Sequence, residues 1–410
     1  MIKYKSIKLK NGLTVISDYM PETPMATFSI AYKVGSKNEN RERTGLAHLF
    51  EHLMFGGSKN VPEFDKAVEM AGGSNNAFTT SDYTNYYITL PAANIETAFY
   101  LESDRMFHPN LSEQTLQIQR KVVIEEYKQR VLNPPYGDLM LNLLPLAYSQ
   151  HPYRWPVIGA KIDHIEEMTL LDVKDFHSKY YNPSNAVLSV SGNVPSDQVF
   201  ELAEKWFSQA AGNKDLLDEL PAEPMQNGER KKVVEKDVPM DMIVMAYHMG
   251  KKNSRDFYRG DLLSDVMAYD RSSRFQQYLR TSDSVFTSLN ASITGFLDSG
   301  LFLIRGKLHE GYSVEQGIEV IENQMLSIQQ DLTEDEVQKA INKIITFQKV
   351  GYLNHANRAQ DLCYAQIVRD PGYINDQFIE YQKTTRDEIL QFASERFNVA
   401  NRNLLIYKKK

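Results

Sequence analysis

Two histidines and a glutamate near the start of the chain form the group of residues with the clearest chemical potential. His48 and His52 are four residues apart, and Glu51 lies between them. On a helix, residues four apart lie on one face, so these imidazoles are placed to share a metal ion, with Glu51 bordering the same face. A catalytic zinc needs neutral nitrogen ligands, one further protein ligand and an open position for water. Glu51 is then placed to accept a proton from that water.

The residues around this motif predict a buried helix. Gly45 precedes the two histidines, the stretch 46–55 is rich in leucine and phenylalanine, and Gly56-Gly57 follows it. A buried helix that carries three ionisable side chains needs partners for them. The alternative is that both histidines are surface or packed core residues. Nine histidines in 410 residues make this spacing rare by chance, which favours the metal site.

Length and composition limit the class of protein. A chain of 410 residues exceeds one ordinary hydrophobic core, so two domains of about 200 residues each are expected. The net charge of -7 arises from acidic and basic residues mixed along the chain, which gives no reason to expect nucleic acid or an acidic membrane as partner. Cys363 is the only cysteine, so no internal disulfide forms and a small buried side chain is expected.

The first residues lack the apolar core of a signal peptide, and no run approaches the ~18 apolar residues of a membrane span. The sequence therefore predicts a cytoplasmic protein with no membrane partner.

An internal repeat, offset by about 215 to 220 residues, divides the chain into two halves built alike. The segment 31–35 returns as 246–250, each time an alternating strand that stops at glycine. Ser112 and Thr333 each precede a helical pattern and are suited to cap it. We therefore predict an internal duplication.

The repeat also predicts the domain organisation. Strands alternate with clusters of helices in each half, which indicates an α+β class with one sheet and packed helices per domain. Glycines, prolines and mixed charges interrupt the hydrophobic pattern within 211–235, so this segment is the expected linker between domains 1–210 and 236–410. In the second half, the positions of His48, Glu51 and His52 are occupied by Leu263, Val266 and Met267. We expect the first half to bind the metal and the second to be non-catalytic.

The sequence resembles the pitrilysin/insulinase family of zinc peptidases, especially its small bacterial members and the mitochondrial processing peptidase subunits. The inverted motif 48–52 and a later segment, Arg120-Lys121-Val122-Val123-Ile124-Glu125-Glu126, carry this resemblance. Adjacent helical residues point about 100° apart, so only one of the two glutamates can face the metal. The resemblance assigns Glu126 as the third ligand and leaves Glu125 facing solvent or supporting the ligands.

One position near these residues departs from the family. Many members have a glutamate seven residues before the ligand, where this chain has Gln119. An amide can still hydrogen-bond a metal ligand, but the change removes a negative charge that helps to hold the cation. We expect weaker metal affinity as a result.

Two further segments resemble substrate-binding parts of the family. The stretch 72–79 resembles an edge strand on which an extended peptide is laid, and Asn76 and Ala77 occupy the substrate-binding positions. The alternative is that Gly72-Gly73 is a turn before a purely structural strand. In the second half, Arg280 matches an arginine that helps to hold substrate, although its usual tyrosine partner is replaced by Thr287. A solvated helix residue is the alternative for Arg280.

The resemblance implies two homologous α/β-sandwich domains and a zinc endopeptidase with one Zn²⁺ per chain. Family members enclose peptides or unfolded segments in a chamber of four domains, and this chain supplies two. A homodimer, or a heterodimer with a homologous subunit, is therefore expected. The alternative is a non-catalytic or partner-dependent subunit of a peptidase-like complex, which the departures at Gln119 and Thr287 favour.

Overall fold

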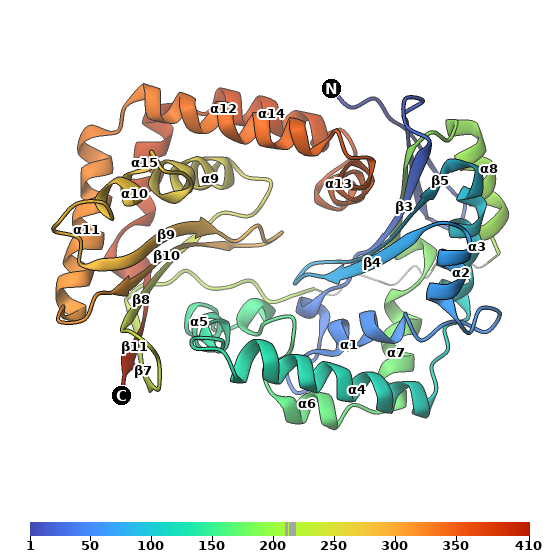
Figure 1. Ribbon diagram of the computed structural model, residues 1–410, viewed down its shortest axis with the longest axis horizontal. Helices are drawn as coiled ribbons and strands as arrows, with labels where there is room; N and C mark the ends of the chain where they lie inside the picture. Colours follow the sequence, from blue (N-terminus) through green and yellow to red (C-terminus); the bar gives the residue numbers. More distant parts are fainter. Residues whose placement is uncertain (210–211, 213–218) are drawn as a thin grey trace. The chain divides into compact units, whose positions relative to one another are not determined.

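The computed structural model describes residues 1–209, 212 and 219–410. These residues form two compact units, each built around one β-sheet (Figure 1). The first unit comprises Met1–Gln129, Trp155–Leu220 and Lys349–Asn375, and the second comprises Arg130–Arg154, Pro221–Gln348 and Asp376–Lys410. The predicted mixed α/β fold with two domains is confirmed.

The two sheets share one topology. The first has the strand order β1-β2-β6-β3-β5-β4 and the second β7-β11-β8-β10-β9. Their strands are β1 (Lys5–Lys8), β2 (Thr14–Tyr19), β3 (Met25–Tyr32), β4 (Ser74–Thr79), β5 (Thr84–Pro91), β6 (Ala186–Gly192), β7 (Arg230–Lys236), β8 (Met242–Met249), β9 (Phe286–Ile293), β10 (Gly300–Leu308) and β11 (Arg402–Lys409).

Without β1, the first sheet matches the second strand for strand. In each matched set, the strand that comes first in the chain pairs in parallel with the strand that comes last in the chain. These parallel pairs are β2 with β6 and β7 with β11. All other neighbouring strands of the two matched sets run antiparallel. Identical order and direction are what a duplicated unit retains, so the topology supports the duplication predicted from the repeat.

The helices of the first half are α1 (Leu46–Leu53), α2 (Phe64–Met70), α3 (Ile95–Phe107), α4 (Glu113–Tyr127), α5 (Leu139–Ala147), α6 (Ile162–Glu166), α7 (Leu170–Tyr180) and α8 (Ser196–Phe207). Those of the second half are α9 (Arg255–Ala268), α10 (Arg274–Tyr278), α11 (Val314–Asp331), α12 (Glu334–Gly351), α13 (His355–Val368), α14 (Tyr373–Lys383) and α15 (Arg386–Arg396). The two predicted caps are confirmed. The Ser112 hydroxyl accepts from the backbone of Thr115 at 3.1 Å, and the Thr333 hydroxyl accepts from the backbone of Glu336 at 3.3 Å.

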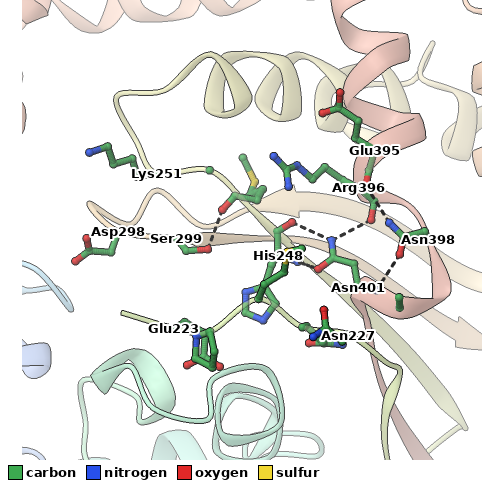
Figure 2. Close-up of a pocket in the computed structure, with 16 residues that line it drawn as sticks. Glu223, Asn227, His248, Lys251, Asp298, Ser299, Glu395, Arg396, Asn398 and Asn401 are labelled. Atoms are coloured by element: carbon green, nitrogen blue, oxygen red, sulfur yellow. Dashed lines mark hydrogen bonds between the residues drawn. The ribbon is translucent and has the colours of Figure 1, made fainter. Parts of the chain in front are cut away.

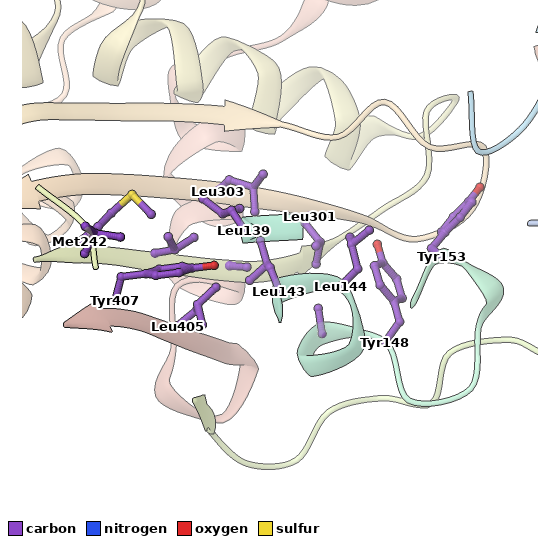
Figure 3. Packing of buried hydrophobic residues seen from close by; sticks show 14 residues of the cluster. Leu139, Leu143, Leu144, Tyr148, Tyr153, Met242, Leu301, Leu303, Leu405 and Tyr407 are labelled. Atoms are coloured by element: carbon purple, nitrogen blue, oxygen red, sulfur yellow. The ribbon is translucent and has the colours of Figure 1, made fainter. Parts of the chain in front are cut away.

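One helix from each half of the sequence belongs to the compact unit that is formed mainly by the other half. Helix α5 belongs to the second unit, where it packs on the second sheet (Figure 3). The buried cluster there includes Leu139, Leu143, Leu144, Ala147, Val244, Leu301, Leu405 and Tyr407. Helix α13 belongs to the first unit, where it packs on β3 and β6. Its Cys363 is fully buried, as predicted.

The predicted domains 1–210 and 236–410 stay a prediction, and part of the predicted linker 211–235 lies outside the described residues. The compact units differ from these contiguous ranges because α5 and α13 each bury an apolar face on the sheet of the other half. In addition, β7 pairs with β11, so the last residues of the predicted linker already belong to the second sheet.

A buried ion pair connects α13 to the first sheet. Arg358 of α13 donates from Nε and Nη2 to the two carboxylate oxygens of Asp18 on β2, at 2.6 and 2.5 Å. The Asp18 side chain is inaccessible to solvent. Burial raises the pKa of its carboxyl group and Arg358 opposes that rise. The pair therefore lets a carboxylate remain charged beneath the helix.

We expect Arg358→Ala to lower the free energy of unfolding by about 3–5 kcal/mol at neutral pH, because it leaves a buried carboxylate without its cation. Without Arg358 the folded-state pKa of Asp18 rises further above its unfolded value. The loss in free energy of unfolding should therefore increase as the pH rises above about 4, and it should be smaller at lower pH. Urea unfolding at several pH values measures this. The control is Arg369→Ala, which removes an exposed pair with Asp370 and should cost less than about 1 kcal/mol. Equal small losses for both variants would contradict the expectation.

Among the described residues, none of the helices combines the length and apolar character that crossing a bilayer requires.

Candidate metal centre

Helix α1 carries the paired histidines and is fixed at its start by two features. Gly45 precedes it with φ at 91°, and a β-carbon there would lie 3.0 Å from the carbonyl oxygen of Ile158. A glycine is therefore required. The Glu39 carboxylate accepts from the backbone nitrogens of Gly45 and Ala47 at 2.9 and 2.8 Å. Burial raises the pKa of Glu39 to about 8, while these donors favour its charged form.

Three ligand atoms converge where α1 packs against α4. Glu126 Oε2 lies 3.3 Å from His52 Nε2, and Glu126 Oε1 lies 3.7 Å from His48 Nε2. One ligand atom from each of the three residues lies within 4.8 Å of the others. Ligands about 2.0–2.2 Å from a tetrahedral zinc lie about 3.3–3.6 Å from one another, and the two distances from Glu126 to the histidines are close to this range.

The donor set also fits zinc in its chemistry. Two imidazoles and one carboxylate match the three protein ligands of catalytic zinc sites, which leave a fourth position open. All three side chains are mostly buried. A carboxylate facing two imidazole nitrogens is favourable when a cation or proton lies between them. Among the described residues, this is the only cluster of histidine, cysteine and carboxylate side chains close enough to hold a metal.

The two adjacent glutamates of α4 point in different directions. Glu126 faces the histidines, whereas the Glu125 side chain is 61% exposed and pairs with Lys128 at 2.6 Å. Helix α4 then continues as a π-helical segment, Lys128–Leu132. Gln119 lies two turns before Glu126 on α4 and is half-buried. The geometry thus places Glu126, and not Glu125, beside the histidines.

Glu51 lies beside the ligands on α1 but does not join them. Its carboxylate accepts a hydrogen bond from the hydroxyl of Thr79, the last residue of β4. The sequence reasoning missed Thr79 because threonine is common in strands and its residue type gives no functional signal. It also missed Glu39, which caps α1 from a loop.

The predicted substrate-binding residues of the first half lie on β4, the outermost strand of its sheet. Asn76 is exposed and pairs in register with Tyr87, and Ala77 pairs with Tyr86. The Asn76 side-chain oxygen accepts from the backbone nitrogen of Ala77 at 2.8 Å. An outer strand with one long side uncovered can pair with an added chain.

Arg280 and Thr287 belong to the second unit. Arg280 is exposed in a turn that follows α10. Thr287 on β9 is exposed, and its hydroxyl donates to the carbonyl oxygen of Lys307 at 3.2 Å. The repeat positions that replace the metal motif, Leu263, Val266 and Met267, are at most 3% exposed and form part of the apolar core. The second unit therefore has packing where the first has the metal ligands.

A cavity of about 640 Å³ lies in the second unit (Figure 2). Its polar side chains mainly stabilise the surrounding backbone. Asn401 donates to the carbonyl oxygen of His248 at 3.0 Å, and Ser299 donates to that of Met249 at 3.0 Å. The Glu223 carboxylate accepts from three successive backbone nitrogens of residues 149–151. No predicted site residue lines this cavity, so the metal centre is the candidate functional site.

Comparison with protein families gives two successive matches along the chain. The family described as "Insulinase (Peptidase family M16)" matches residues 14–161, and the one described as "Peptidase M16 inactive domain" matches residues 167–344.

Among known proteins, the chain is 32% identical over 408 residues to the zinc protease PqqE of Helicobacter pylori, covering 96% of this chain and 90% of that protein. It is 26% identical over 341 residues to the uncharacterized zinc protease YmxG of Bacillus subtilis, covering 82% and 81%. The crystal structure of a protease from Helicobacter pylori matches with a TM-score of 0.94 and 30% identity, covering both chains completely. A peptidase M16 inactive domain from Pseudomonas fluorescens shares the fold, with a TM-score of 0.89, 16% identity and coverage of 100% and 98%.

Proposed function

The chain belongs to the insulinase (M16) peptidase family, and from this we propose that it is a zinc-dependent endopeptidase that cleaves peptides or unfolded segments. The observation that carries the proposal is the convergence of His48, His52 and Glu126, with Glu51 beside them. The names of the relatives support a zinc protease. The site keeps every residue type that metal-assisted hydrolysis requires.

His48, His52 and Glu126 would hold one zinc ion per chain. When bound, zinc supplies a Lewis acid that polarises a peptide carbonyl and makes water more acidic. Glu51 accepts the proton of the attacking water at its carboxylate and then delivers it to the nitrogen of the leaving amine. Because Glu51 is no ligand, its carboxylate is available for this transfer.

We further propose that the substrate binds as an extended strand along β4. Backbone pairing at an open edge holds a peptide with little regard to its sequence. Asn76 and Ala77 would contact it. The Asn76 oxygen accepts from the Ala77 backbone nitrogen, in the manner of a carbonyl of an added strand. Arg280 is a proposed contact from the second unit. Only an extended or unfolded segment can pair in this way.

A dimer that encloses the substrate, either of two copies or with a homologous subunit, is part of this proposal and rests on the family resemblance. The cytoplasmic location also stays a prediction. The second candidate function is a non-catalytic or partner-dependent subunit, which Gln119 and Thr287 favour because they replace a charged and an aromatic family residue.

We expect the purified protein to cleave a mixed library of internally quenched peptides. A chelator should reduce the rate to background and added Zn²⁺ should restore it. One substrate protein offered in its folded and in its unfolded form provides the matched comparison, and the unfolded form should be cut much faster. Equal cleavage of both forms would contradict the proposed substrate class. Stoichiometric zinc without cleavage would favour a partner-dependent subunit, and absence of bound zinc would favour a scaffold.

A further inference from the structure

The hydrogen bond between Thr79 and Glu51 joins two segments with different proposed tasks. Glu51 is the proposed proton acceptor on α1, and Thr79 ends the strand on which the peptide is proposed to lie. The Thr79 hydroxyl donates to Oε2 of Glu51, and both residues are half-buried. A hydrogen bond to a carboxylate is stronger than one between neutral groups, so it can select one orientation of the side chain.

The surroundings of Thr79 set the direction of its hydroxyl proton. The hydroxyl of fully buried Thr84 donates to the carbonyl oxygen of Val34 at 2.9 Å and reaches Thr79 Oγ1 at 3.4 Å. The one proton of Thr84 is thereby given to Val34, and an ionised carboxylate can only accept, so the Thr79 hydroxyl gives its own proton to Glu51.

The turn that follows Thr79 is held firmly. The Thr80 hydroxyl accepts from the backbone nitrogens of Asp82 and Tyr83 at 3.1 and 3.0 Å. Asp82 pairs with Lys37 at 2.8 Å. The Tyr83 ring stacks on Tyr364 of α13, with ring centres 5.2 Å apart. A positioning group must itself be fixed in place, and these contacts meet that condition.

We propose that Thr79 is a positioning residue that orients the Glu51 carboxylate for proton transfer and ties that orientation to the substrate-binding strand. The inference rests on the proposed peptidase function. Because β4 carries both the peptide and the Thr79 hydroxyl, placing a peptide in register along β4 also sets the distance between its scissile bond and Glu51. The base and the substrate are thus aligned by one strand.

Two substitutions test this role. Thr79→Val keeps the shape of the side chain and removes the hydroxyl, and it should lower kcat about 10- to 100-fold with little change in KM. Thr79→Ser restores the hydroxyl and should recover most of kcat. Zinc content should stay stoichiometric in both. Thr89→Val is the control, because it removes the hydroxyl that bonds Thr27 at 2.7 Å in the same sheet and should leave kcat unchanged.

A second measurement does not depend on turnover. The melting temperatures of the wild type, Thr79→Val, Glu51→Ala and the double variant form a mutant cycle. Each single variant removes the hydrogen bond, so a direct contact should make the two effects non-additive. Additive effects would overturn the proposal, as would an unchanged kcat or a Thr79→Ser variant as impaired as Thr79→Val. If the zinc-loaded wild type cleaves nothing, the proposed function fails. The cycle then still shows whether Thr79 holds Glu51.

Discussion

Replacing Glu51 with glutamine is expected to leave zinc bound and to lower kcat by about 10²–10⁴-fold. Glutamine keeps the size of the side chain and can still accept from Thr79, but its amide cannot take up the proton of the attacking water. The metal ligands are unchanged, because His48, His52 and Glu126 form the cluster without Glu51. Cleavage of quenched peptides and zinc content, measured on the same preparation, test both parts.

The matched control for this substitution is Glu42→Gln, which makes the same chemical change at an exposed loop residue before α1. It should behave as the wild type. A Glu51→Gln variant that keeps more than a tenth of wild-type kcat would remove Glu51 from its proposed role. Loss of zinc in this variant would mean that Glu51 contributes to metal binding.

Replacing Glu126 with glutamine is expected to lower zinc affinity by more than about a hundredfold and to abolish cleavage. Changing a residue that only supports a metal ligand lowers metal affinity or activity 10- to 100-fold. The loss of a charged ligand should lower zinc affinity by more than that. Competition with a coloured chelator measures the affinity. Excess Zn²⁺ should restore only part of the activity, because an amide oxygen is a poorer ligand than a carboxylate.

Glu125→Gln is the internal control for Glu126, since both changes fall on the same turn of α4. Glu125 is exposed and pairs with Lys128, so its replacement should leave zinc affinity and kcat close to wild type. If Glu125→Gln lost the metal and Glu126→Gln retained it, the assignment of the third ligand would be reversed.

The parts of the fold and site that the sequence predicted are those with local causes. His48 and His52 share a face because helical spacing requires it, and the caps at Ser112 and Thr333 follow from side-chain chemistry within one turn. The repeat predicted two matching sheets, and their strand order agrees. Choosing Glu126 over Glu125 required the family resemblance, because helical geometry shows only that one of them can face the metal.

The parts that the sequence did not predict depend on contacts between distant segments. Thr79 meets Glu51 only after β4 has packed against α1, and Glu39 reaches the start of α1 through a loop. The placement of α13 on the first sheet depends on a match between two surfaces, which no local pattern encodes. For the same reason, contiguous domain boundaries do not describe the compact units.

The exchange of α5 and α13 has a consequence for the timing of synthesis. The third segment of the first unit begins at Lys349, about 130 residues after its second segment ends at Leu220. At 5–20 residues per second, a ribosome needs roughly 6 to 26 s to cover that distance. During this interval β3 and β6 lack α13, the helix that packs on them. A nascent chain therefore completes its metal-binding unit only after most of the second unit has been made, and a chain truncated before α13 never completes it.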